Sequence, residues 1–278
     1  MTARPLRPPA WVTTTLCTLA AAALLLIGWQ VAIGLSHLSP YLAKTPVDVW
    51  RYLFVDGTGD TAAERRDALV PMIGVTLLHS TVGLLLGVSA GFVGAVLLTV
   101  SRALRSIFLP LALLLQTVPL IAMAPVIYAV FGSGILTAAV VAAVVTFFPL
   151  LMNIGAGLTS STPETIDLVR AYGGGRWTLL RFVQLPASLP SLFAGLKLAA
   201  PATVSAATLY EFLFSFEGLG ANLLTSKSYS DYGLLWTLVV ITVLLSLAAY
   251  GLVVAAETLL LTGRFPPRES TSAPKGHA

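Results

Sequence analysis

Polar side chains that could bind a solute or carry a proton interrupt several long apolar stretches of this sequence. They comprise an imidazole, two carboxamides, an amine and two carboxylates: His79, Gln116, Asn153, Lys197, Glu211 and Glu257. Burying an ionisable group in lipid is costly, so such groups are functional candidates. The neutral amides of Gln116 and Asn153 can bind a polar solute on a translocation path without burying a charge. Hydrogen bonding between helices is the competing and slightly stronger interpretation.

The charged members of this set differ in their expected depth. Glu211 follows Ser191 by about 20 residues, hence by about 30 Å along a helix, which predicts a position near the outer surface. There it could close an outer gate or simply be hydrated. Lys197 and Glu257 lie near the inner ends of their apolar stretches and are expected to reach interfacial water. For His79, a packing role is favoured over a proton relay.

The sequence carries no pattern of a catalytic, metal or nucleotide site. It has no G-x-x-x-x-G-K-[ST] phosphate loop and no H-E-x-x-H motif, and its three histidines are scattered. Cys17 is the single cysteine, which excludes an intrachain disulfide framework. We therefore expect no catalytic residue, no metal site and no cofactor in this chain.

Composition places the chain in the membrane. Hydrophobic residues make up 56% and charged residues 10%, with a mean hydropathy of +0.88, whereas a soluble domain carries about 25% charged residues. The formal charge of +4 might suggest nucleic acid as a partner, but the basic residues form no dense run with interleaved aromatics. Nucleic acid is therefore not expected as a partner, whereas membrane lipid is expected as one.

The elements that hold these side chains are predicted to be membrane-spanning helices, since about 20 apolar residues cross the hydrocarbon core. The fold class is all-α, a polytopic membrane protein with one domain at 13–261, a cytoplasmic segment at 1–12 and a disordered tail at 262–278. A hairpin at Gly132–Gly134 separates the third span from the fourth. The six predicted spans are Thr13–Leu35, Ile73–Val100, Phe108–Phe131, Ile135–Leu158, Leu192–Leu213 and Leu234–Leu261.

Charge placement predicts the orientation. Ten of the fifteen Lys and Arg residues outside the spans fall in 1–12, 101–107, 159–190 and 262–278. The alternate intervals hold five, outweighed there by seven acids. Because Lys and Arg favour the cytoplasmic side, both termini and the interval 159–190 are expected to be cytoplasmic.

The polar interval 159–190 is predicted to hold two short helices. Thr162 before Pro163 and Glu164 is typical of a helix start, and Gly173–Gly175 is expected to stop that helix and reverse the chain. A second helix is predicted over Trp177–Val183, ending before Leu185-Pro186, with a membrane helix from about Pro190. An amphipathic hairpin lying on lipid headgroups is the alternative.

This interval resembles the cytoplasmic EAA loop of binding-protein-dependent ABC importer permeases, which reads Glu-Ala-Ala, three residues, Gly, nine residues and Ile-x-Leu-Pro. Both internal spacings are kept here. The aspartate stands in the Glu place, and bulkier Leu-Val replaces Ala-Ala. The matching positions are Asp167, Leu168, Val169, Gly173, Val183, Leu185 and Pro186.

Further segments from about residue 39 to 260 resemble the nitrate, sulfonate and taurine branch of this family. They include prolines flanking an apolar stretch before Phe-Gly-Ser-Gly, a Phe-Phe-Pro with a later Asn, and a Glu ahead of Gly-Leu-Gly. The positions are Pro119, Pro125, Phe131–Gly134, Phe147–Pro149, Asn153, Ala194–Lys197, Glu211 and Gly218–Gly220.

The resemblance implies a permease subunit of the bacterial inner membrane and not an enzyme. Its coupling helix would dock on a separate ATPase subunit, present in two copies, which would bind the ATP and Mg. The other implied partners are a second permease chain, as a homodimer, and a periplasmic or lipid-anchored solute-binding protein, which Glu211 could contact. The implied solute is a sulfonate- or nitrate-like anion, or a vitamin-precursor-like heterocycle.

Two other classes were weighed. A secondary transporter or channel working without an ATPase would predict paired charges near mid-membrane and internal repeats, and neither is evident in the sequence. An integral membrane enzyme would need clustered His, Asp or Ser residues at catalytic spacing, which are absent.

Overall fold

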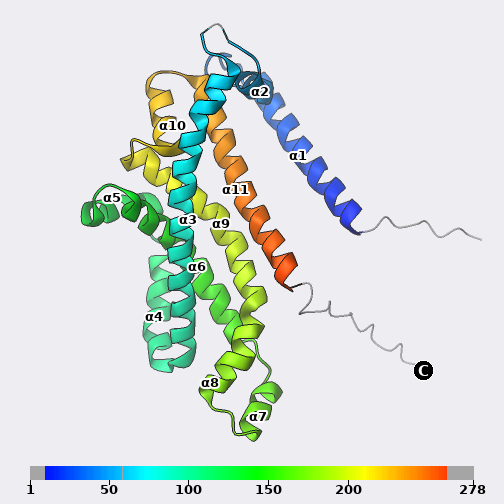
Figure 1. Ribbon diagram of the computed structural model, residues 1–278, viewed down its shortest axis with the longest axis vertical. Coiled ribbons are helices and arrows are strands. Elements are labelled where there is room, and N and C mark those ends of the chain that lie inside the picture. Colours follow the sequence, from blue (N-terminus) through cyan, green and yellow to red (C-terminus); the bar gives the residue numbers. More distant parts are fainter. Residues whose placement is uncertain (1–9, 58, 262–278) are drawn as a thin grey trace, which may run out of the picture. The chain divides into compact units, whose positions relative to one another are not determined.

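The computed structural model of the chain describes residues 10–57 and 59–261, and every regular element in these ranges is a helix (Figure 1). This confirms the predicted all-α class. The helices are α1 Ala10–Leu35, α2 Pro46–Phe54, α3 Ala62–Val100, α4 Arg102–Leu115, α5 Leu120–Phe131, α6 Ile135–Leu158, α7 Pro163–Ala171, α8 Arg176–Leu179, α9 Leu185–Phe214, α10 Gly218–Ser228 and α11 Tyr232–Leu261.

Helix length and composition support a polytopic membrane protein. Among the described residues, five helical segments are long and apolar enough to span a membrane, and a bent pair of helices raises the number to six. The fourth predicted span, Ile135–Leu158, coincides with α6. The predicted tail at 262–278 and residues 1–9 lie outside the described residues.

The third predicted span is not one continuous helix. Phe108–Phe131 contains α4 and α5, which are bent by 106° at the break between them. Pro119 begins α5 and has no N–H to continue the α4 hydrogen-bond ladder, and it disfavours helical geometry at Val118. Apolar content alone could not show this break, since both flanks are equally apolar.

α2 and α10 lie outside the predicted spans. α2 begins with a capping box, in which the Thr45 side chain accepts from the Asp48 N–H and the Asp48 carboxylate accepts from the Thr45 N–H. The backbone hydrogen bond from Thr45 lowers the pKa of Asp48, and the Thr45 hydroxyl adds to this shift. α10 follows α9 after a short turn.

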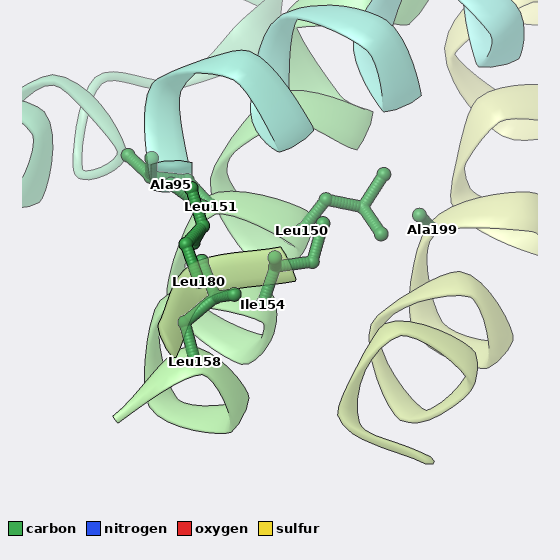
Figure 2. Close-up of a cluster of buried hydrophobic side chains, with 7 residues drawn as sticks. All are labelled: Ala95, Leu150, Leu151, Ile154, Leu158, Leu180 and Ala199. Carbon is green, nitrogen blue, oxygen red and sulfur yellow. The ribbon is translucent and has the colours of Figure 1, made fainter. Parts of the chain in front are cut away.

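The chain divides into two compact units, the first with residues 1–71 and 222–240 and the second with residues 72–221 and 241–278. In the second unit α6 packs along α9, and a buried hydrogen bond of 2.6 Å joins Thr146 Oγ1 to Thr203 Oγ1. The same unit holds a cluster of buried hydrophobic side chains from α3, α6, the segment after α8 and α9 (Figure 2).

Small residues let α3 approach α6 closely. A Cβ added at Gly83, Gly87 or Gly91 would meet Ala142, Thr146 or Leu150 of α6, respectively. The every-fourth-residue glycine pattern therefore serves packing within the chain.

Candidate functional site

The polar interval folds into a helix, a turn and a second helical segment. The Thr162 hydroxyl accepts from the Thr165 N–H at 3.4 Å and caps α7, with Pro163 in the first turn. Hydrogen bonds to the carboxylate from the Glu164 backbone N–H, and then from the Thr162 hydroxyl, lower the pKa of Glu164. The predicted helix start is confirmed.

Gly173 reverses the chain after α7. Its φ of +76° lies in the left-handed region, and its N–H donates to the Arg170 carbonyl at 2.9 Å. Gly174 then donates to the Val169 carbonyl at 2.8 Å. The helix is thus stopped by glycine as predicted.

The second helix does not end before Leu185-Pro186, which corrects the prediction. A π-helical turn, Leu180–Gln184, connects α8 directly to α9, so the chain is helical from Arg176 to Phe214. The Leu185 N–H donates to the Leu180 carbonyl five residues back, a wider ring than in an α-helix. This turn accommodates Pro186, which has no N–H, at the start of α9.

Leu180 anchors the π-helical turn to the protein core. Its side chain is buried and packs in the hydrophobic cluster with Ile154 and Leu158 at the end of α6 (Figure 2). The base of α9 is therefore fixed to α6, whereas α7 and the turn after it extend beyond this cluster.

The outer surface of the α7–α8 segment carries exposed apolar side chains. Leu168 is 58% exposed, Tyr172 86%, Trp177 75% and Phe182 69%. Asp167 is exposed and lies 3.5 Å from Arg170, one helical turn on. Of the other predicted positions, Val169, Val183 and Leu185 are half-buried, and Pro186 is exposed.

A second polar site surrounds Glu211 near the end of α9. Its carboxylate is fully buried. Oε2 accepts from Thr76 Oγ1 at 2.7 Å and from the Gly220 N–H at 3.0 Å, and Oε1 lies 2.8 Å from His79 Nδ1. Hydration of Glu211, one expected alternative, does not hold in this structure.

Sequence reasoning missed the pairing of His79 with Glu211. Thr76 and His79 are spaced one turn apart on α3, and the Gly-x-Gly after α9 brings two backbone N–H groups to the same place. A carboxylate so close to a Gly-x-Gly turn is the signal that could have indicated a buried site, but its partners on α3 are set by tertiary packing.

Lys197 and Glu257 also form an unexpected pair. Lys197 Nζ lies 2.9 Å from Glu257 Oε2, and both side chains are mostly buried at 28% and 23% exposure. The two charged groups contact each other, which corrects the prediction that each side chain reaches interfacial water. Charge pairs were the feature expected of a secondary transporter, so the family comparison below decides between the two classes.

The structure does not bring Gln116 and Asn153 together in one site. Gln116 ends α4 at the break before α5 and is exposed on a cavity of about 430 Å³, which Thr117 and Pro149 also line. Asn153 is half-buried on α6, where its side-chain amide donates to the Pro149 carbonyl at 2.8 Å. One N–H of its amide is thus bonded within its own helix.

Comparisons with known proteins agree with these features. Residues 83–260 match the model of the family described as "Binding-protein-dependent transport system inner membrane component". A probable ABC transporter permease protein of Haemophilus influenzae is 31% identical over 226 residues, which cover 81% of this chain and 89% of that protein.

Two further relatives are named for heterocyclic solutes. The riboflavin transport system permease protein of Chloroflexus aurantiacus is 32% identical over 160 residues, 58% of this chain and 60% of that protein. The formylaminopyrimidine transport permease protein of Halalkalibacterium halodurans is 27% identical over 241 residues, 87% of this chain and 93% of that protein.

Permeases named for aliphatic sulfonates, taurine and nitrate are similar as well. The relatives are named as transport permease proteins, which favours the permease class over a secondary transporter. This chain, a multi-pass inner-membrane protein, therefore belongs to the family of binding-protein-dependent transport system inner membrane components, in the nitrate, sulfonate and taurine branch.

Proposed function

We propose that this chain is the membrane-spanning subunit of an ATP-driven importer and that residues 159–190, the coupling loop, dock on a separate ATPase subunit. The observation that carries this proposal is the row of exposed apolar side chains on the loop. Water does not favour such a surface, so it indicates a protein or lipid partner. The continuous helical segment from Arg176 to Phe214 would carry movement of the loop into the membrane.

A protein groove explains the loop better than a lipid surface does. Tyr172 and Leu168 are exposed beside the charged pair Asp167–Arg170 at the end of α7. An apolar centre with a polar rim is typical of protein interfaces. Arg181, which lies over the Phe182 ring at 5.7 Å, is the residue that best fits an interfacial headgroup contact.

The assembly would have two ATPase subunits, which bind the ATP and Mg, and a second copy of this chain. A solute-binding protein, periplasmic or lipid-anchored, would deliver the solute at the other face of the membrane. Both termini would lie in the cytoplasm, as the placement of Lys and Arg predicts.

The translocation path would pass the break between α4 and α5. Non-helical backbone at membrane depth is tolerated where it is covered by protein or lines a water-filled cavity, and Gln116 lies at such a cavity. Asn153 is less suited to bind a solute because its amide is already paired. The solute would be a small polar molecule, a sulfonate- or nitrate-like anion or a heterocycle of the kind named for the relatives.

Purification of the tagged chain from native membranes tests this function. We expect a phosphate-loop ATPase to co-purify and to be identified by mass spectrometry. Replacing the exposed pair, Leu168→Ser with Tyr172→Ser, should reduce the recovered ATPase at least tenfold, which corresponds to about 1.4 kcal/mol. The matched control replaces exposed apolar residues on α11, Leu247→Ser with Leu252→Ser, and should retain the ATPase. Recovery of the chain without any ATPase would contradict the proposal.

A further inference from the structure

The Glu211 cluster consists of Thr76, His79, Glu211 and the glycine turn Gly218–Gly220, which is the first turn of α10. It joins α3 and α9 to the start of α10. The carboxylate of Glu211 bonds to α3 through Thr76 and His79 and to the turn through the Gly220 N–H. Thr76 Oγ1 in turn accepts from the Leu219 N–H at 2.9 Å. Three contacts therefore meet at one buried acid, and a fourth ties Thr76 to Leu219.

The glycines of this turn are required by the closeness of the carboxylate. Gly218 has a φ of +90°, and a Cβ added there would overlap the carboxylate of Glu211. A Cβ at Gly220 would overlap the Thr208 carbonyl and crowd the Phe212 amide. The turn is thus fitted to the acid, and the acid is enclosed by it.

Separating these groups is costly because the carboxylate of Glu211 is fully buried. His79 Nδ1 lies within hydrogen-bond distance of Oε1, at 2.8 Å. The His79 ring also lies edge-on to Tyr210, with ring centroids 5.9 Å apart. Leaving a buried polar group without its hydrogen-bond partners costs free energy, so the cluster has a well-defined closed state.

The position of the cluster relates it to the coupling loop. Glu211 lies on the helical segment that begins at Arg176 in that loop, 35 residues earlier in the sequence, which is about 50 Å along a helix. The base of this segment is fixed by Leu180, and the end of α9 is held by Glu211. A displacement applied at the loop and transmitted along α9 reaches the cluster.

We propose that Glu211 is a positioning residue that holds the end of α9 against α3 in one state of the transport cycle, and that the Glu211 cluster opens when ATP acts on the coupling loop. The inference rests on the proposed function, because the movement originates in the ATPase subunit. The cluster is the group of contacts that sets the energy difference between the two positions of α9.

The first test uses hydrolysis of MgATP by the intact permease–ATPase complex in lipid nanodiscs. Glu211→Gln removes the charge, and His79→Leu removes the donor to Oε1, so both should raise hydrolysis in the absence of solute about tenfold. His79→Gln retains an N–H donor and should stay near the unmodified rate. Ser80→Ala, also buried on α3 but outside the cluster, is the matched control and should leave the rate unchanged.

A donor-dependent pattern distinguishes positioning from simple loss of stability. A purely structural role would make His79→Leu and Glu211→Gln lower the yield of complex without raising its rate per complex. If both variants assemble with the ATPase and hydrolyse ATP at the unmodified rate, the inference is overturned. Failure of the unmodified chain to bind an ATPase would instead contradict the proposed function.

A second test closes the cluster with a reversible covalent bond. In a Cys17→Ser background, Thr76→Cys with Leu219→Cys replaces one contact of the cluster by a bond that copper phenanthroline forms and dithiothreitol reduces. Closing this bond should lower hydrolysis at least tenfold, and reduction should restore it. An unchanged rate in complexes whose disulfide is shown by mass spectrometry would overturn the inference.

Discussion

Lys197 Nζ lies 2.9 Å from Glu257 Oε2 and joins α9 to α11 within the second unit. Both side chains are mostly removed from solvent, so neither charge is well hydrated without the other. Because α9 is continuous with the coupling loop, this ion pair links the helix that would move to the last membrane helix. It leads to the first prediction.

Removing one charge of this pair should destabilise the chain more than removing both charges. We expect Lys197→Met to destabilise the chain by about 2 kcal/mol, because it leaves Glu257 an unpaired acceptor. Lys197→Met with Glu257→Leu should recover most of that loss. Thermal unfolding in detergent, followed by size-exclusion chromatography, measures both. Equal losses in the single and double variants would show that the pair contributes nothing.

The packing of α3 on α6 predicts a second result. Gly87→Ala should destabilise the chain by about 1–3 kcal/mol, since the added methyl group meets Thr146. Gly74→Ala on the same helix is the control, because nothing lies within 4 Å of its added Cβ, and it should be neutral or stabilising. A comparable loss in the two variants would refute the packing argument.

The turn after α7 predicts a third result. Gly173→Val should uncouple ATP hydrolysis from transport or abolish ATPase binding, because a β-branched residue disfavours the φ of +76° at this position. No neighbour lies within 4 Å of an added Cβ, so the effect comes from the backbone alone. Gly173→Asn should restore function in part, since asparagine tolerates that region. Gly175→Ala is the control, because Gly175 has a φ of −85° and no neighbour within 4 Å of an added Cβ. Loss of ATPase binding in this variant too would show that the effect comes from the whole turn and not from the φ of Gly173.

The break between α4 and α5 predicts a fourth result. In a Cys17→Ser background, Gln116→Cys should react with a water-soluble thiol reagent, because its cavity is expected to connect with the path. Leu114→Cys lies two residues away and is 67% exposed in the single chain, but is expected to face lipid and to react slowly. Similar rates at the two positions would argue against a path at Gln116.

The sequence predicted those features that depend on local chemistry. Thr162 caps α7 and Gly173 ends it, because hydroxyl caps and left-handed glycines act within a few residues. The span of α6 was found to the residue, since it is uninterrupted apolar sequence bounded by Gly134 and a polar interval.

The features that the sequence did not predict depend on tertiary contacts or on backbone geometry. Nothing in the apolar sequence around Pro119 distinguishes a tolerated proline from a 106° break, and Pro186 lies in a helix only because a π-helical turn precedes it. Glu211 and His79 are 132 residues apart. Their pairing requires α3 and α9 to be adjacent, which a single sequence does not reveal.

Accessibility of Tyr172 provides the most direct test of the central claim that the coupling loop is cytoplasmic and binds an ATPase. With Cys17→Ser, Tyr172→Cys should react with a membrane-impermeant maleimide only from the cytoplasmic side, and slowly when the ATPase subunit is bound. Asp60→Cys, exposed in the loop before α3, should react from the opposite side at a rate that the ATPase does not change. Rapid labelling of Tyr172→Cys from outside, or labelling unaffected by bound ATPase, would contradict the account.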